Sequence, residues 1–324
     1  MKRRTFLATA GLSLTTAAAG CTSQATSNGS SESDTETATS TPDEPQTGTD
    51  QMPERTLIET GNTVERTLGT GSLEERDLRR PHYVAFSNPT DETHQGTVTI
   101  LQSGETVLDE SVELEPNATI AASLTDLDTY TARMAVPALD ATEGVTIDPG
   151  QFTCNMTKTT ISIQGDGTLD SVGISTRMAC PGVVTEHVAT DESASHTLGD
   201  DPVPADTGKG IHSLLLRNPS DETWTTQLLV ERDSTTQFDG IYTVEPNGTV
   251  LLTLSESGTY SLSMGVFETE TVVTEQITPE NFDCNQSSTR AVIDSEGELS
   301  ASTVSTQMGC EVDTNTTNES SSQN

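Results

Sequence analysis

The chain has 324 residues, a length that suggests two domains of ordinary size. Its 50 acidic residues outnumber 15 basic ones, which gives a formal net charge of -35 at pH 7. This balance argues against nucleic acid as a partner, because phosphate binding needs clustered Lys and Arg. Only 31% of the residues are hydrophobic, so either the core is thin or parts of the chain are unstructured.

Residues 1–21 have the layout of an export signal. Basic residues at 2–4 precede an apolar run from Phe6 to about Ala19, and small residues precede Cys21. The run is diluted by Thr and Gly, whereas a membrane-spanning helix needs about 20 strongly apolar residues. The segment is therefore predicted to direct export rather than to remain as a spanning anchor.

Two motifs in this segment resemble known signals. Arg3-Arg4-Thr5-Phe6-Leu7 resembles a twin-arginine signal, and Ala18-Ala19-Gly20-Cys21 resembles a lipobox, with Ala18 where the family prefers Leu. The resemblance implies that Cys21 becomes the mature N-terminus and carries a lipid that holds the protein on the outer face of the cell membrane. The alternative is a signal peptide that is cut elsewhere.

Residues 22–54 are expected to form a disordered tether. They contain 14 Ser or Thr, seven Asp or Glu, and no Lys or Arg. With so little to bury, the segment cannot offset its ordering entropy. It would serve as a stalk that lifts the folded part off the membrane, or as a passive linker.

Beyond the tether the chain repeats itself at an interval of 130 residues. Residues 88–93 (NPTDET) return as residues 218–223 (NPSDET), and His82 returns as His212. About 30 of the 99 positions that start at His82 are identical to their partners, with no gap. The chain is therefore predicted to be a tandem duplication, with domains at 55–182 and 183–311 and a disordered tail at 312–324.

Each repeat has the pattern of short strands. Val98 and Ile100 alternate with Thr, and turn residues interrupt such runs about every 8 to 12 positions. Pro116-Asn117 and Pro246-Asn247-Gly248 are typical of tight turns. Helical signal is nearly absent, so we expect an all-β fold of two tandem β-sandwiches, each with about seven to nine strands.

Tyr130 and Tyr260 lie where a strand resumes after Asp128-Thr129 and Gly258-Thr259. This placement resembles the tyrosine corner of immunoglobulin-like sandwiches, in which the hydroxyl bonds to the chain upstream. With the Asn-Pro and Pro-Asn motifs, the repeats resemble immunoglobulin-like domains of twin-arginine-exported haloarchaeal lipoproteins. The resemblance implies a fold, and a fold does not imply an activity.

Lysine is almost absent from the chain. Only Lys2, Lys158 and Lys209 occur, and Asp, Glu or Thr stand at positions that would normally carry Lys. This surface resembles those of haloarchaeal proteins, which stay hydrated in multimolar salt. Its acidic side chains repel one another at low ionic strength, but at 1 M salt this repulsion is screened to within about 3 Å. An acidic surface protein from a mesophile is the alternative.

Five cysteines divide as one plus two plus two. If Cys21 takes a lipid, each repeat keeps one pair 26 residues apart. Thiols outside the cell are oxidised, so we predict two disulfides, Cys154–Cys180 and Cys284–Cys310.

The first pair brackets a predicted hairpin whose turn is Gly165-Asp166-Gly167. Pairing about residue 167 would place Ile161 and Ile163 on the face opposite Val172 and Ile174. A bulge or a one-residue shift is therefore expected.

Metal sites are the competing interpretation of these residues. Zinc is disfavoured because the cysteine pairs lack CxxC spacing and His187 has no counterpart in the second repeat. A cupredoxin-like copper site would need a histidine after Cys310. Met178 and Met308 are instead expected in the core.

Calcium could be bound by Asp126 with Asp128, or by Asp166, but acids that line turns are the favoured explanation. No metal and no cofactor are expected.

Catalytic motifs are not visible. The sequence has no Gly-x-Ser-x-Gly elbow, no His-Glu-x-x-His and no phosphate loop. His82 and His212 are the histidines that recur, and they are expected as surface or packing residues rather than bases. The chain is therefore not expected to be an enzyme.

Glycosylation sequons begin at Asn117, Asn155, Asn247 and Asn285, with the turns at Asn117 and Asn247 as the best candidates. The sequence thus predicts a lipid-anchored, extracytoplasmic, non-catalytic structural or binding module, with a surface protein or glycan as candidate partner. The alternative is a receptor-like component that captures a glycan, ion or small molecule. A polar cleft lined by residues that differ between the repeats would favour the receptor.

Overall fold

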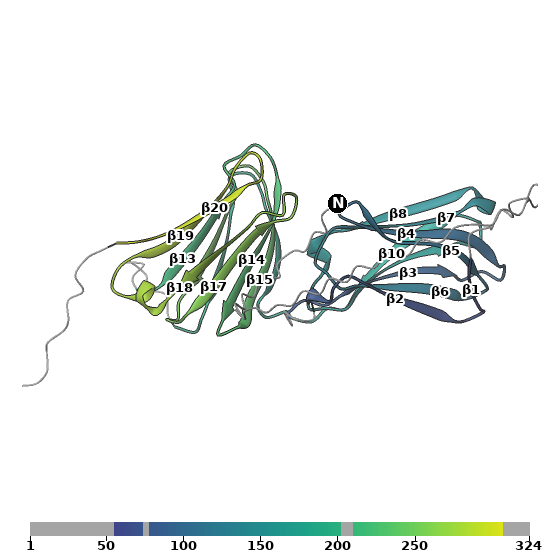
Figure 1. The fold of residues 1–324 in the computed structure, drawn as a ribbon, viewed down its shortest axis with the longest axis horizontal. Coiled ribbons are helices and arrows are strands. Elements are labelled where there is room, and N and C mark those ends of the chain that lie inside the picture. Colours follow the sequence, from purple (N-terminus) through teal and green to yellow (C-terminus); the bar gives the residue numbers. More distant parts are fainter. Residues whose placement is uncertain (1–54, 74–77, 202–209, 307–324) are drawn as a thin grey trace, which may run out of the picture. The chain divides into compact units, whose positions relative to one another are not determined.

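The computed structural model describes residues 55–73, 78–201 and 210–306. Strands dominate this part of the chain and fall into two groups, β1–β10 and β11–β20 (Figure 1). The described helical elements include three short 3-10 turns: η1 (Pro137–Leu139), η2 (Pro149–Gln151) and η3 (Pro279–Phe282). No helix among the described residues is long and apolar enough to cross a membrane.

Each group of ten strands forms two five-stranded sheets. The first sandwich has the strand orders β1-β5-β4-β7-β8 and β10-β9-β3-β6-β2, and the second has β11-β15-β14-β17-β18 and β12-β16-β13-β19-β20. The predicted all-β architecture of two tandem sandwiches is confirmed, although ten strands replace the expected seven to nine. The number expected from the sequence was low because a run of three residues such as Thr56–Ile58 is too short to be predicted as a strand. It is a strand only through its pairing with β5 at the edge of the sheet.

The first sandwich is built from β1 (Thr56–Ile58), β2 (Thr63–Leu68), β3 (His82–Asn88), β4 (His94–Gln102), β5 (Glu105–Leu114), β6 (Ala118–Leu124), β7 (Tyr130–Val136), β8 (Ala141–Ile147), β9 (Thr157–Ile163) and β10 (Leu169–Ser175). The second is built from β11 (Val183–Val188), β12 (Ser193–Leu198), β13 (His212–Arg217), β14 (Trp224–Arg232), β15 (Thr235–Val244), β16 (Thr249–Leu254), β17 (Tyr260–Val266), β18 (Val272–Ile277), β19 (Ser287–Ile293) and β20 (Leu299–Ser305).

Six consecutive strands of each repeat have immunoglobulin-like pairing. In the first sandwich β3 and β6 share one sheet while β4, β5, β7 and β8 share the other, as strands B, E and C, C′, F, G do in variable-type domains. The frame departs from that pattern beside β3, where the hairpin β9–β10 is added and β9 runs parallel to β3.

A core of aliphatic side chains fills the space between the two sheets of each sandwich. Val98 and Ile100, predicted to face inward, are fully buried together with Phe86 from the opposite sheet. The polar partners on each strand face solvent because side chains alternate along a strand. The alternation of Val or Ile with Thr therefore predicted the buried face of the strand correctly.

The asparagine of the Asn-Pro motif is buried at the end of β3, where its side chain holds the turn that follows the strand. The Asn88 amide is fully buried and donates to the carbonyls of Glu92 at 2.7 Å and Leu114 at 2.9 Å. Its oxygen accepts from the backbone and hydroxyl of Thr90. Asn218 repeats this arrangement in the second sandwich, so the recurring asparagine replaces a set of backbone partners that the chain reversal leaves open.

The tyrosine corner is confirmed in both repeats. Tyr130 donates to the carbonyl of Asp126 at 3.1 Å, and Tyr260 donates to the carbonyl of Glu256 at 2.8 Å. Both rings are buried, and burial raises the pKa of each hydroxyl. The corner thus fixes the start of β7 and of β17.

Candidate functional site

The recurring histidines are buried parts of the frame. His82 is 2% exposed and His212 fully buried. The ring nitrogens of His82 lie 2.9 Å from Thr157 Oγ1 and 3.0 Å from Thr159 Oγ1. Burial lowers the pKa of each histidine to about 4, so both are neutral at pH 7. The packing role expected for them agrees with this geometry.

The predicted disulfide between Cys154 and Cys180 is present, with a Cα–Cα distance of 5.6 Å. Cys284 is disulfide-bonded as well, and its predicted partner Cys310 lies outside the described residues. The cysteines join the open end of the β9–β10 ribbon in the first sandwich.

The bulge or one-residue shift that we expected in that ribbon does not occur. Thr160 pairs with Val172, so the strands turn about residue 166 rather than 167. Val172 thus pairs two positions away from Ser162, its partner in pairing about 167, and a change of two positions leaves the faces unchanged. Ile161 and Ile163 are buried on one face, whereas Val172 and Ile174 are 51% and 63% exposed on the other, so the ribbon has apolar residues on both faces.

The core assignment of Met178 is wrong. Its side chain is 63% exposed, because β10 ends at Ser175 and the following residues no longer alternate into the sandwich. Met308 lies outside the described residues.

The acids considered for calcium line turns. Asp126 accepts hydrogen bonds from the backbone and hydroxyl groups of Thr70 and Ser72. Burial alone would raise the pKa of Asp126, but these bonds lower it below its usual value. Asp128 accepts from Ser103 and Asp166 from Thr168 in the same way.

Metal-ligating side chains do not gather within residues 55–73, 78–201 and 210–306, where no group of three or more His, Cys, Asp or Glu could hold an ion. His187, the residue weighed for zinc, instead pairs with Glu245 at 2.9 Å.

The four sequons fall into two structural classes. Asn117 and Asn247 are exposed at turns, each with a φ of 60°. Asn155 and Asn285 are 9% and 6% exposed, and the amide nitrogen of Asn155 donates to the carbonyl of Met178. A glycan on that nitrogen would have to displace this contact, so the geometry favours the two turns. The lipidation residue Cys21 lies outside the described residues.

A buried ion pair joins the two repeats, and sequence reasoning missed it. Arg79, just before β3, is 3% exposed, and its Nε lies 3.0 Å from Oδ1 of the fully buried Asp239 on β15. The guanidinium also donates to the carbonyls of Phe152, Val184 and Asp239. Gln227 donates to the Asp239 carboxylate at 2.9 Å. We call these residues the junction.

Apolar contacts support the junction. Ile241 is 2% exposed and belongs to the apolar cluster of the first sandwich, and Phe267 packs against that cluster. The counterparts of Ile241 and Phe267 in the first repeat are Ser111 and Pro137. Comparison of the repeats would therefore have indicated that this face of the second sandwich is covered.

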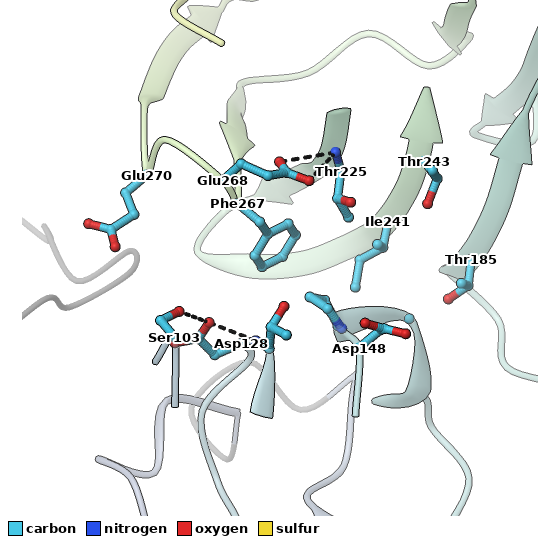
Figure 2. Close-up of a pocket in the computed structure, with 13 residues that line it drawn as sticks. Ser103, Asp128, Asp148, Thr185, Thr225, Ile241, Thr243, Phe267, Glu268 and Glu270 are labelled. Carbon is cyan, nitrogen blue, oxygen red and sulfur yellow. Dashed lines mark hydrogen bonds between the residues drawn. The ribbon is translucent and has the colours of Figure 1, made fainter. Parts of the chain in front are cut away.

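Beside the junction lies a hollow of about 550 Å³, here called the junction hollow. Figure 2 shows Phe267 and Ile241 pointing toward the loops that carry Ser103, Asp128 and Asp148. Glu268 accepts hydrogen bonds from the Thr225 backbone. The hollow is polar, and its carboxylates include Glu270 as well.

Comparison with known proteins adds no family to this description. No family model matches the sequence, and no curated protein matches it.

Proposed function

We propose that this chain is a non-catalytic module displayed outside the cell membrane of a halophilic archaeon and held there by a lipid on Cys21. Its two immunoglobulin-like sandwiches would serve as a structural or binding unit at the cell surface. Residues 22–54 would be the stalk between the lipid and the first sandwich.

The observation that carries this proposal is the use made of the recurring polar side chains. Threonine hydroxyls engage both ring nitrogens of His82, and backbone groups engage the Asn88 amide. In the second repeat, Ser287 and Thr289 engage His212, and backbone groups engage Asn218. Side chains committed to the frame in this way are not available for acid–base chemistry. The Cys154–Cys180 disulfide supports an oxidising location outside the cytoplasm.

Intact-mass analysis of the native membrane fraction tests the anchor. We expect a mature chain that starts at Cys21 and carries lipid mass, and Cys21→Ser should release the protein into the medium. A chain that starts beyond residue 21 without lipid would overturn the anchor and leave the fold untouched.

Salt dependence tests the halophilic part of the proposal. The 50 acids repel one another when screening is weak, so the melting temperature should rise between 0.2 and 3 M salt. Equal melting temperatures across that range would contradict a halophilic surface.

A receptor-like role is the second candidate, and the junction hollow favours it. The hollow is polar, and Ile241 and Phe267 at its wall have different residues at their counterparts in the first repeat. Backbone NMR signals of Thr243 and Glu270 should move on titration with a ligand that occupies the hollow. A panel of surface glycans and divalent cations that moves neither signal would reject this role for the junction hollow.

A further inference from the structure

The first sandwich has a second hollow, beside the strand pair β9–β10. Its volume is about 410 Å³, and we call it the ribbon hollow. It lies between the two strands and the loop that leads from η2 to Cys154. Its lining residues are His82, Gln151, Thr153, Thr157, Lys158, Thr159, Gly173, Ile174, Ser175 and Arg177.

Gly173 is one of the lining residues that differ between the repeats, and it leaves space in this hollow. Gly173 occupies the position that Thr303 holds in the second sandwich. A Cβ placed on Gly173 would meet no atom within 4 Å. The Thr303 hydroxyl, in contrast, lies 2.7 Å from Thr289 Oγ1 and donates to Glu275 at 3.1 Å, so a hydrogen-bonded side chain occupies the equivalent space.

The lining of the ribbon hollow is cationic in an acidic chain. Lys158 and Arg177 both line it, and no aspartate or glutamate does. Neither cation has an ion-pair or hydrogen-bond partner among the residues that the structure describes, whereas Arg66, Arg79 and Arg232 are all paired with acids.

The second repeat lacks this charge. Ser288 and Gln307 stand in place of Lys158 and Arg177, and Asp283 stands in place of Thr153. The same three positions thus carry two positive charges in the first repeat and one negative charge in the second. The difference has a consistent sign, as expected where one copy binds an anion and the other does not.

The walls of the hollow are held in place. The disulfide fixes Cys180, three residues after Arg177, to Cys154, which directly follows Thr153. Thr157 and Thr159 hold the His82 ring beneath them. Fixed walls reduce the ordering cost of binding.

We propose that the ribbon hollow binds a small anion whose charged group is a carboxylate, sulfate or phosphate, on a body the size of one sugar unit. The Arg177 guanidinium can bind such a group through two parallel hydrogen bonds, and Lys158 adds a point charge. The Thr153 hydroxyl accepts from the Asn155 backbone and can still donate to the ligand, and the Ser175 hydroxyl donates to the Thr176 carbonyl and can still accept. The volume falls within the 300 to 1,000 Å³ range of small-molecule sites.

This inference is independent of the proposed display function, because the hollow is built within one sandwich. The anion could be a free acid or the terminal unit of an acidic glycan. Loss of the lipid anchor would leave the site intact, so failure of either proposal can be distinguished from failure of the other.

The test is a titration of the full-length protein with sodium glucuronate, with glucose as the neutral control and sulfate as the control for charge alone. We expect glucuronate to shift the amide signal of Gly173 saturably, glucose to leave it unchanged, and sulfate to compete. A galacturonate hexamer distinguishes the sources: tighter binding than the monomer indicates a glycan end, and equal binding indicates a free acid. If neither glucuronate nor sulfate moves the signal, the proposal is wrong.

The second repeat supplies the variants. Gly173→Thr should abolish binding by filling the hollow, and it is sterically free because no atom lies within 4 Å of the new Cβ. Arg177→Gln should weaken binding about 10- to 100-fold by removing charged hydrogen bonds. Thr303→Gly is the matched control and should leave glucuronate affinity unchanged. Equal affinity in the wild type and in Gly173→Thr, with both proteins folded, would overturn the assignment.

Discussion

In each sandwich a contact between the two sheets closes the same edge, and the residues that make this contact differ. We call this contact the edge closure. In the first, Arg66 on β2 and Glu110 on β5 form an ion pair with 2.7 Å between Nε and Oε1. In the second, His196 replaces the arginine and its ring centroid lies 5.9 Å from that of Tyr242. The glutamate is replaced by Gly240, where a Cβ would come within 2.6 Å of the Tyr242 ring. Both copies therefore keep a contact between the two sheets at this edge, although the residue types that form it have changed.

The comparison separates two classes of residue. Positions that recur, such as His82, Asn88 and Tyr130, make hydrogen bonds that hold strands and turns. Among the many positions that differ are those of the edge closure, the junction and the ribbon hollow. The recurring residues make polar contacts of the frame, and the differing residues at these three places give the two copies different local chemistry.

The junction gives the largest predicted effect. Arg79→Met leaves the buried Asp239 carboxylate without its cation and should lower the free energy of unfolding by about 3 to 5 kcal/mol. Chemical denaturation in high salt measures this loss. Arg133→Met, at an exposed arginine, is the control and should cost little.

Removal of both charges separates the loss of the ion pair from the burial of an unpaired carboxylate. Replacing both charges in Arg79→Met/Asp239→Leu should recover most of the lost stability, because two apolar side chains leave no charge buried. An Arg79→Met protein as stable as the wild type would show that the pair does not join the repeats.

Disulfide removal tests whether the two ribbons are equivalent. Cys154→Ser/Cys180→Ser should destabilise the first sandwich by about 3.5 kcal/mol on the chain-entropy estimate for a 26-residue loop. Cys284→Ser/Cys310→Ser should have an effect of similar size on the second. Nonreducing peptide mapping gives the connectivity, and a link between Cys154 and either Cys284 or Cys310 would contradict pairing within each repeat.

The buried histidines predict a pH dependence shared by both repeats. Their pKa is about 4 in the fold against about 6.5 in an unfolded chain, so the unfolded state binds more protons between these values. Stability should be complete above pH 6.5 and fall by up to about 3 kcal/mol per histidine as the pH drops toward 4.

Substitution isolates this effect from the titration of carboxylates. His82→Asn should halve the loss between pH 6.5 and 5, and His82→Asn/His212→Asn should nearly remove it. If the wild type and the double variant lose the same stability over that range, the histidines are not its source.

The edge closures give the smallest predicted effect. Arg66→Gln removes a partly exposed ion pair and should cost at most about 1 kcal/mol, less in high salt. His196→Gln removes ring packing on Tyr242 and the contact of the ring with Glu186 at 3.1 Å. It should cost about 0.5 to 1.5 kcal/mol, with a smaller salt dependence than Arg66→Gln. Thermal melts at 0.5 and 3 M salt would measure the contrast, and an equal salt dependence of the two variants would contradict it.

Much of the fold could be predicted because its signals are local. The Pro116-Asn117 turn, the tyrosine corners and the alternation around Val98 each depend on a few neighbouring residues. Met178 was misassigned for the same reason, since spacing from Cys180 does not reveal that β10 ends at Ser175.

The candidate sites depend on contacts that are distant in sequence. Arg79 and Asp239 are 160 positions apart, and neither has an unusual local context. The ribbon hollow was accessible in principle, because Gly173 faces Thr303 in the alignment of the repeats. The effect of this difference could not be predicted from the sequence. The structure shows that the threonine fills the space that the glycine leaves open.

The claim that differing residues carry the function is tested most directly by building the site into the other copy. The variant Asp283→Thr/Ser288→Lys/Thr303→Gly/Gln307→Arg gives the second sandwich the two cations and the glycine of the ribbon hollow and removes its aspartate. Isothermal titration with glucuronate should then show a stoichiometry that rises from about one to about two ligands per chain. A folded variant that still binds one ligand, or a wild type that already binds two, would contradict the claim.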